Sequence, residues 1–304
     1  MSQGHSQAAA WAREGERSYV WLLRLMVWIS LTAGRSLGRV VLYGIALYFV
    51  LFAPKAQRAS RAYLARVLGR APRWRERYRH VLCFATTIHD RVFLLKNRDA
   101  QFQVHVQGAD ALHAALQGGR GALLMGAHLG SFEVLRTMGQ ERGGLRVAMA
   151  MYEDNARQLN ATLAAIAPEA MQDVIALGRM DAMLAVRDRL DEGCLVGLLA
   201  DRSLGADDAC ARLPFLGAEA AFPLGPWRLA AMLQRPVFFM AGLYLGGNRY
   251  EIRFEPIADF HTTPRADRPA AMAEAQRAYV AALERALRAV PMNWFNFYDF
   301  WQTP

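Results

Sequence analysis

The segment GALLMGAHLGSFE, which runs from Gly121 to Glu133, combines an apolar run with a polar turn. Its apolar part lacks the alternation of a half-exposed strand, so we expect a strand that is buried on both faces. Gly130 and Ser131 then supply a turn and a helix cap, and Glu133 falls in the first turn of the helix that follows. This strand–turn–helix order is the building unit of an α/β sheet.

Similar apolar runs alternate with helical stretches from about residue 108 to the C-terminus. The expected strands are 121–128, 146–152, 173–177, 195–201, 236–244 and 249–257. The expected helices are 56–69 and 72–97 before the first strand, and 131–141, 155–167, 179–192, 225–233 and 266–288 after it. This alternation predicts an α/β domain with a mostly parallel mixed sheet that is covered by helices. The last strand alternates more openly, as in a hairpin or at a sheet edge.

The composition is that of a folded protein with a large core. The chain has 304 residues, of which 54% are hydrophobic and 21% are charged, which excludes a disordered tail protein and a fibrous repeat. The three cysteines form no C-x-x-C pair, so we expect a reducing compartment and no structural zinc. They are Cys83, Cys194 and Cys210.

The positive charge is concentrated in one short segment. Residues 55–79, which we call the basic segment, hold nine Lys and Arg side chains against one acid, Glu76, and so carry +8 of the net charge of +9. Such a concentration suits an anionic lipid surface, an acidic protein or nucleic acid. Nucleic acid is the weakest of these, because the sequence has no zinc-finger spacing and no aromatic ribonucleoprotein motif. We therefore expect no nucleic-acid partner.

Two apolar stretches precede the basic segment, at residues 18–34 and 36–53, with one charge each. Both approach the ~20 apolar residues of a membrane span, and a following excess of Lys and Arg marks the cytosolic side. We expect a membrane-attached helical N-terminus at residues 1–54 and a cytosolic domain at 55–304. One span, a hairpin and an interfacial helix all fit. A pair of buried helices in a soluble protein is the alternative, whereas a cleaved signal peptide is disfavoured by the long charged leader.

His128 and Glu133 form the main candidate catalytic pair. On a continuous helix, residues five apart point about 140° away from each other, but Gly130 lets the chain turn between them. We expect Glu133 to accept a hydrogen bond from one imidazole nitrogen, which leaves the other as a base for a hydroxyl. The alternative is a histidine that only satisfies the neighbouring backbone.

Other kinds of site are disfavoured by the sequence. Ser131 lacks the G-x-S-x-G elbow of a serine nucleophile. The glycines at 118, 119 and 121 precede a strand, so they are not a dinucleotide loop. No set of metal-ligand spacing occurs. We therefore expect no metal and no cofactor.

Four blocks in the second half of the chain carry a family resemblance. They are HLGSFE (His128–Glu133), VGLLADR (Val196–Arg202), AFPLGPWRLA (Ala221–Ala230) and RPVFFMA (Arg235–Ala241). In this order they resemble the lysophospholipid acyltransferase superfamily, and above all its lipid A late-acyltransferase branch, whose first block reads H-x-x-x-x-[DE]. The resemblance implies a glycerolipid acyltransferase-like α/β fold.

The resemblance also implies roles for individual residues. Arg202, with Asp201 beside it, corresponds to the arginine that is associated with the acceptor's phosphate or headgroup. Pro223 and Gly225 correspond to residues that shape the acceptor site. Arg179 lies outside the blocks and is a further candidate for substrate binding because of its charge.

The function implied by the resemblance is an O-acyltransferase. It would move a fatty acyl chain from a thioester of acyl carrier protein or coenzyme A to a hydroxyl of an envelope lipid or glycolipid. His128 would take the hydroxyl proton, Glu133 would orient the imidazole, and backbone amides near Gly130 would stabilise the oxyanion. The basic segment would face an anionic membrane or the carrier protein. We expect the bacterial inner membrane as the location, with the catalytic domain facing the cytoplasm.

Two features depart from the superfamily's usual patterns. The third block has Leu224 where glycerolipid members usually carry glutamate, which argues against lysophosphatidate as the acceptor. The C-terminal NWFNFYDFW, residues 293–301, replaces the arginine-rich tail expected of lipid A enzymes. It is similar to the tails of predicted bacterial acyltransferases found with polyene and other envelope-lipid pathways, which moves the expected acceptor away from lipid A itself. A non-catalytic membrane adaptor and an acyl-thioester hydrolase are the alternative functions.

Overall fold

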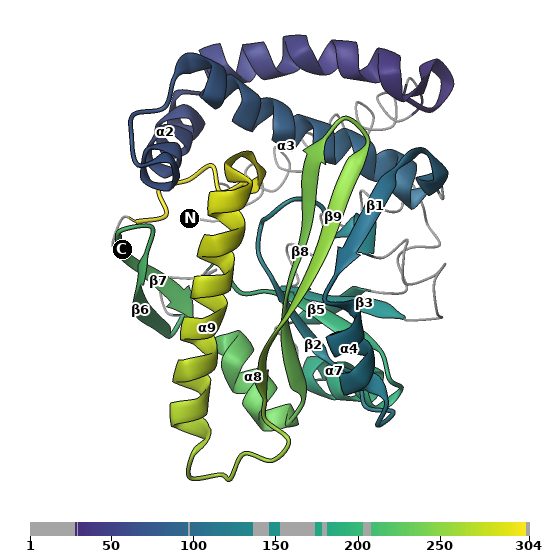
Figure 1. Ribbon diagram of the computed structural model, residues 1–304, viewed down its shortest axis with the longest axis vertical. Coiled ribbons are helices and arrows are strands. Elements are labelled where there is room, and N and C mark those ends of the chain that lie inside the picture. Colours follow the sequence, from purple (N-terminus) through teal and green to yellow (C-terminus); the bar gives the residue numbers. More distant parts are fainter. Residues whose placement is uncertain are drawn as a thin grey trace, which may run out of the picture.

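A computed structural model describes most of the chain. The described residues are 28, 30–96, 98–135, 146–152, 174–177, 181–202 and 208–301. Three consecutive helices open this part: the N-terminal helix Ser30–Phe52, α2 (Pro54–Leu68) and α3 (Trp74–Leu95) (Figure 1). Gly69 ends α2 in the left-handed region, with φ at 67°, and Glu76 accepts a hydrogen bond from the backbone amide that precedes α3. Both helices predicted for 56–97 are confirmed.

Seven strands form the main sheet of the described residues. They are β1 (Gln103–Gln107), β2 (Leu123–Gly126), β3 (Val147–Tyr152), β4 (Val174–Leu177), β5 (Leu195–Leu199), β8 (Pro236–Gly246) and β9 (Arg249–Asp259). Their order is β1-β9-β8-β2-β5-β3-β4, and every neighbouring pair is parallel except the hairpin β8–β9. The predicted mostly parallel mixed sheet is confirmed.

The remaining elements lie around this sheet. They are α4 (Ala109–Leu116), α7 (Ala182–Asp191), α8 (Gly225–Leu233), α9 (Arg268–Ala289), the short helices η1 (Asp99–Gln101) and η3 (Pro291–Asn293), and the hairpin of β6 (Cys210–Phe215) and β7 (Ala218–Pro223). Figure 1 shows α9 as a long helix beside α8 and the β6–β7 hairpin.

The central strand β2 is buried on both faces, as its uninterrupted apolar run predicts. Leu123 and Met125 point into a core that also contains side chains of α2, α7, α8 and α9. Leu124, between them, points into a second core with α3 and α4. The side chains of all three residues are fully buried. Successive residues of a strand face opposite sides, so a strand covered by helices on both sides has to be apolar throughout.

The predictions missed the elements without continuous apolar runs. β1 has the sequence QVHVQ, contains no fully buried residue, and pairs with the outer edge of β9. α4 buries only Leu112, and the β6–β7 hairpin contains Pro214 within a strand. The open alternation of β9 predicts a hairpin or a sheet edge, and the structure shows the hairpin, with β9 between β8 and β1. The helix expected at 155–167 lies outside the described residues, and of the helix expected at 131–141 the described part is helical only at 133–135.

Candidate active site

The loop that follows β2 places His128 at the carboxyl ends of the parallel strands. Two other segments hold this loop. The Gly130 amide donates to the carbonyl of Asn293 at 2.9 Å, and the Phe295 amide donates to the carbonyl of His128 at 2.7 Å. On the other side, the Ser131 amide donates to the carbonyl of Gly242 in β8 at 2.7 Å. The loop is therefore fixed between β8 and the C-terminal segment.

Two glycines allow this close crossing. Gly130 has a φ of +68° and lies against the backbone of Gly242. A Cβ atom on Gly130 would collide with the carbonyl oxygen of Gly242, and a Cβ atom on Gly242 would collide with the carbonyl oxygen of Ser131. Glycine is needed at Gly130 for its backbone conformation and at both positions for space.

We expect Gly130→Ala to destabilise the protein more than Gly119→Ala. The two glycines have φ values of 68° and 69°, so both substitutions add about 1–2 kcal/mol of left-handed strain. Only at Gly130 would the new Cβ also meet backbone, since nothing lies within 4 Å at Gly119. Overpacking of this kind adds about 1–3 kcal/mol. Urea unfolding of both variants measures the difference, and equal losses would contradict the close crossing.

Asp201, just after β5, binds the imidazole of His128. Its Oδ1 lies 2.9 Å from Nδ1 of His128, and its Oδ2 accepts the backbone amide of the same residue at 3.0 Å. The Oδ2 atom also accepts from Trp294 Nε1 at 3.1 Å and from Asn296 Nδ2 at 2.9 Å. Asp201 is fully buried. Burial favours its protonated form, but the charge and hydrogen bonds of His128 outweigh this and lower the pKa of Asp201 to about 2.

An ionised Asp201 defines the tautomer of His128. A carboxylate can only accept, so Nδ1 carries a proton, and in the neutral form of the ring the lone pair is therefore on Nε2. The side chain of His128 is 28% exposed and lines a cavity at this end of the sheet. This geometry is that of a general base that is oriented by a buried carboxylate.

Glu133 occupies a different position from the one expected. It forms an ion pair with Arg91 of α3 and accepts a hydrogen bond from Ser131 Oγ at 3.2 Å. The hydrogen bond expected from His128 to Glu133 is thus made to Asp201 instead. The physical reason is that the extended loop brings Nδ1 to the end of the neighbouring strand β5, whereas Glu133 turns toward α3.

The amides near Gly130 are also committed elsewhere. Those of Leu129, Gly130 and Ser131 donate to the carbonyls of Ala127, Asn293 and Gly242. These three amides already have backbone acceptors, so the expected oxyanion role does not fall to them.

Arg202 lies beside Asp201 and lines the same cavity as His128. Its guanidinium donates to Asn296 Oδ1, and it lies 4.9 Å from the centre of the Tyr298 ring. Burial raises the pKa of Tyr298 to about 12, although Arg202 opposes this rise. Asn296 thus holds Asp201 through its amide nitrogen and Arg202 through its oxygen, which fixes the two side chains relative to each other.

The cavity has a volume of about 480 Å³ and a mostly apolar wall. This volume lies within the range of small-molecule sites. The apolar wall includes Phe84 and Ile88 of α3, Met149 and Met151 of β3, Leu199 of β5 and Phe295. The polar side chains in the wall include His128, Glu133, Arg91 and Arg202. An apolar cavity with a few polar groups at one point is suited to a substrate with a hydrocarbon part and a reacting polar end.

The other predicted substrate-binding residues are placed as follows. Gly225, the first residue of α8, lines the cavity. Pro223 ends β7, and its carbonyl accepts a hydrogen bond from Gln276 Nε2 at 3.0 Å, so it supports the turn before α8. Arg179 lies outside the described residues.

Sequence reasoning missed Arg91, Trp294 and Asn296 as parts of the site. Trp294 is fully buried, and His80 of α3 fixes its backbone through a 2.6 Å contact from Nε2 to the carbonyl oxygen. Burial lowers the pKa of His80 to about 4, so this side chain is neutral at pH 7. The only signal in the sequence was the polar Asn296 within the aromatic segment 293–301.

A histidine held by a buried carboxylate thus lies at the wall of an apolar cavity in an α/β fold, an arrangement that suits a substrate with a hydrocarbon part. The chain belongs to the family described as bacterial lipid A biosynthesis acyltransferase, whose profile matches residues 9–303. A comparison with curated proteins gives no match. Family membership shows an acyltransferase of lipid biosynthesis with a lipid A-like acceptor, and it confirms the resemblance found in the four sequence blocks.

Proposed function

We propose that the protein transfers a fatty acyl chain from a thioester to a hydroxyl of an envelope lipid or glycolipid, with His128 as the general base. The observation that carries this proposal is the imidazole of His128 at the wall of the apolar cavity, with Nδ1 bound to Asp201. The family supports acyl transfer, and the cavity supports a substrate with a hydrocarbon chain.

In the proposed reaction, Nε2 of His128 takes the proton of the acceptor hydroxyl. The oxygen attacks the thioester carbonyl, the C–S bond breaks, and the departing thiolate receives the proton. The product is an ester and a free thiol, so no acyl-enzyme is required. Asp201 holds the ring and stabilises the imidazolium, and general-base assistance of this kind contributes about 10² to 10⁴-fold.

Three other charged groups complete the proposal. Arg202 binds an acceptor phosphate through its planar guanidinium. The guanidinium groups of Arg91 and Arg202 line the cavity and serve as donors to the oxyanion, since the amides of Leu129–Ser131 already have acceptors. Glu133 balances the positive charge that gathers in the cavity when the imidazole is protonated.

The donor and the location are part of the same proposal. Acyl carrier protein or acyl-CoA supplies the thioester, and the basic segment binds anionic lipid or the acidic carrier protein. We place the enzyme at the bacterial inner membrane with its catalytic domain in the cytoplasm, because a basic segment beside an apolar N-terminal region suits the anionic cytoplasmic leaflet.

Product identity distinguishes this proposal from thioester hydrolysis. The purified full-length protein is given acyl carrier protein or coenzyme A thioesters, with and without an envelope-lipid extract. We expect an acylated lipid that forms only when both substrates are present. Release of free fatty acid at the same rate without lipid would instead identify a hydrolase, and no thiol release with either donor would favour the adaptor.

A further inference from the structure

The N-terminal helix Ser30–Phe52 is long and apolar enough to cross a membrane, yet it lies alongside α3 and contacts it at several points (Figure 1). Near its start, the carbonyl of Leu31 accepts from Arg98, just beyond α3. Near its middle, the carbonyl of Tyr43 accepts from Tyr78 Oη at 3.0 Å. Toward its end, Ala46 and Val50 pack against Val81. The partners of successive helix residues come from progressively earlier positions in the chain, so the two helices are antiparallel neighbours (Figure 1).

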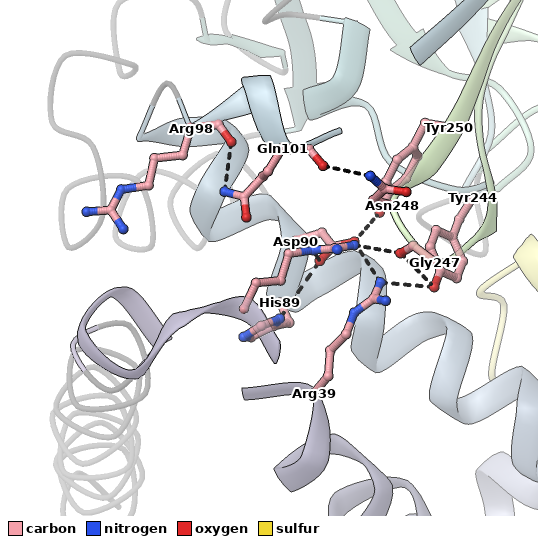
Figure 2. A network of polar contacts seen from close by, with 10 residues as sticks. Arg39, His89, Asp90, Arg98, Gln101, Tyr244, Gly247, Asn248 and Tyr250 are labelled. Carbon is pink, nitrogen blue, oxygen red and sulfur yellow. Dashed lines mark hydrogen bonds and ion pairs between the residues drawn. The ribbon is translucent and has the colours of Figure 1, made fainter. Parts of the chain in front are cut away.

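Polar contacts centred on Asp90 of α3 hold the N-terminal helix in this position. Arg35 donates from Nε and Nη2 to the two carboxylate oxygens of Asp90, at 2.7 and 2.8 Å. Arg39 reaches the same carboxylate at 3.4 Å and Tyr244 Oη at 3.0 Å. Tyr250 Oη donates to Asp90 at 2.9 Å. Figure 2 shows Asp90 between Arg39 of the helix and the two tyrosines of the β8–β9 hairpin.

Separating the N-terminal helix from α3 costs free energy. Asp90 is fully buried and would lose its charge partners if the helix left α3. Gly38 supports the close fit, because a Cβ atom there would collide with the imidazole of His89. Both arginines of the helix therefore point toward the protein and are held there.

The opposite face of the helix is apolar and exposed. Large side chains are between 40% and 67% exposed on it, and the arginines do not interrupt it. They are Leu37, Val40, Val41, Tyr43, Leu47, Tyr48, Phe49, Leu51 and Phe52. An exposed apolar surface of this kind marks an interaction site.

A membrane-crossing orientation conflicts with these contacts. Because the helix is fixed along α3, crossing would draw α3 into the hydrocarbon region as well. The helix α3 carries Arg75, Arg77, Arg79 and Arg91, and charged side chains at that depth are costly. A helix that lies parallel to the bilayer surface has no such conflict, since only its apolar face enters the lipid.

We propose that the helix Ser30–Phe52 lies in the plane of one leaflet of an anionic phospholipid bilayer, with its apolar face inserted and its arginines on the protein side. The positive charge of the neighbouring basic segment favours an anionic bilayer as the partner of this apolar face. The basic segment begins three residues after the helix ends, and seven of its side chains are exposed. They are Lys55, Arg58, Arg61, Arg70, Arg73, Arg75 and Arg79. A second copy of the chain would bring two basic segments together, whereas anionic headgroups neutralise one.

Thiol labelling in sealed inverted membrane vesicles tests this orientation. Ser36→Cys places an exposed thiol in the second turn of the helix, and Lys55→Cys places one three residues beyond its end. The wild-type chain, with Cys83 and Cys194 buried, gives the background labelling. We expect a membrane-impermeant maleimide to label both positions. Labelling of one position only, or of neither while a permeant maleimide labels both, would overturn the in-plane orientation.

Flotation of the full chain with phosphatidylglycerol–phosphatidylcholine vesicles tests whether the apolar face of the helix binds an anionic bilayer. We expect Leu47→Glu with Leu51→Glu to weaken vesicle binding at least fivefold. The matched control is Leu184→Glu with Met232→Glu, which adds the same charge at side chains that are equally exposed elsewhere, and it should stay within twofold of wild type. Equal effects of the two pairs, or no binding by the wild type, would contradict the proposal. Neither assay measures acyl transfer, so both stand or fall independently of the proposed reaction.

Discussion

Replacing His128 by alanine is expected to lower the rate of acyl transfer by about 10² to 10⁴-fold, the contribution of a positioned general base. The ring is part of the cavity wall, and its Nδ1 is already held by Asp201, so only Nε2 is available for the acceptor proton. Initial rates of the purified protein with a saturating thioester measure the effect. The loss should appear in kcat, because the base acts on the bound acceptor.

His113→Ala is the matched control. His113 lies on α4, where it is exposed, and it is absent from the cavity wall. This variant should keep wild-type activity. Transfer by His128→Ala at more than a small percentage of the wild-type rate, in protein of unchanged melting temperature, would remove His128 from the role of base.

The second large effect is expected for Asp201→Asn. The amide keeps the shape of the side chain but cannot accept all four hydrogen bonds that reach Asp201 from His128, Trp294 and Asn296. Donors left without acceptors cost about 1–3 kcal/mol of stability each. The imidazole also loses the carboxylate that defines its tautomer, so kcat should fall by about 10² to 10⁴-fold beyond any loss of folded protein.

Glu133→Gln distinguishes the role of the Glu133 carboxylate from that of the Asp201 carboxylate. Its side chain contacts Arg91 and Ser131, so the substitution should reduce the rate less than Asp201→Asn does. Both rates are divided by the fraction of folded protein, measured by circular dichroism at the assay temperature. A greater loss for Glu133→Gln than for Asp201→Asn would assign the orienting role to Glu133, as the sequence spacing alone had suggested.

The sheet was predictable because burial on both faces leaves a mark in the sequence. The runs that became β2, β5 and β8 are continuously apolar, and a Pro near the start of α8 and α9 marks where these helices begin. The strand β1 at the sheet edge and the separate β6–β7 hairpin leave no such mark, since both mix polar with apolar residues. Local sequence does not encode which strand β1 pairs with.

The site was only partly predictable because its contacts join distant segments. His128 and Asp201 are separated by 73 residues and become neighbours only through the pairing of β2 with β5. The sequence predicted Asp201 as a substrate-binding residue and not as the partner of His128. Asn296 comes from the C-terminus, 95 residues beyond Asp201, and its amide joins the site only after the chain closes on the loop. Spacing along the chain favoured Glu133 because it reports only on local neighbours.

The most direct test of the proposed function is mass spectrometry of the total lipids of a host that carries either the wild-type protein or His128→Ala. We expect one lipid class to lack a single acyl chain only with the variant, which would establish transfer and name the acceptor together. Unchanged lipids with the variant present at its normal level would contradict acyl transfer by this site and favour a membrane adaptor.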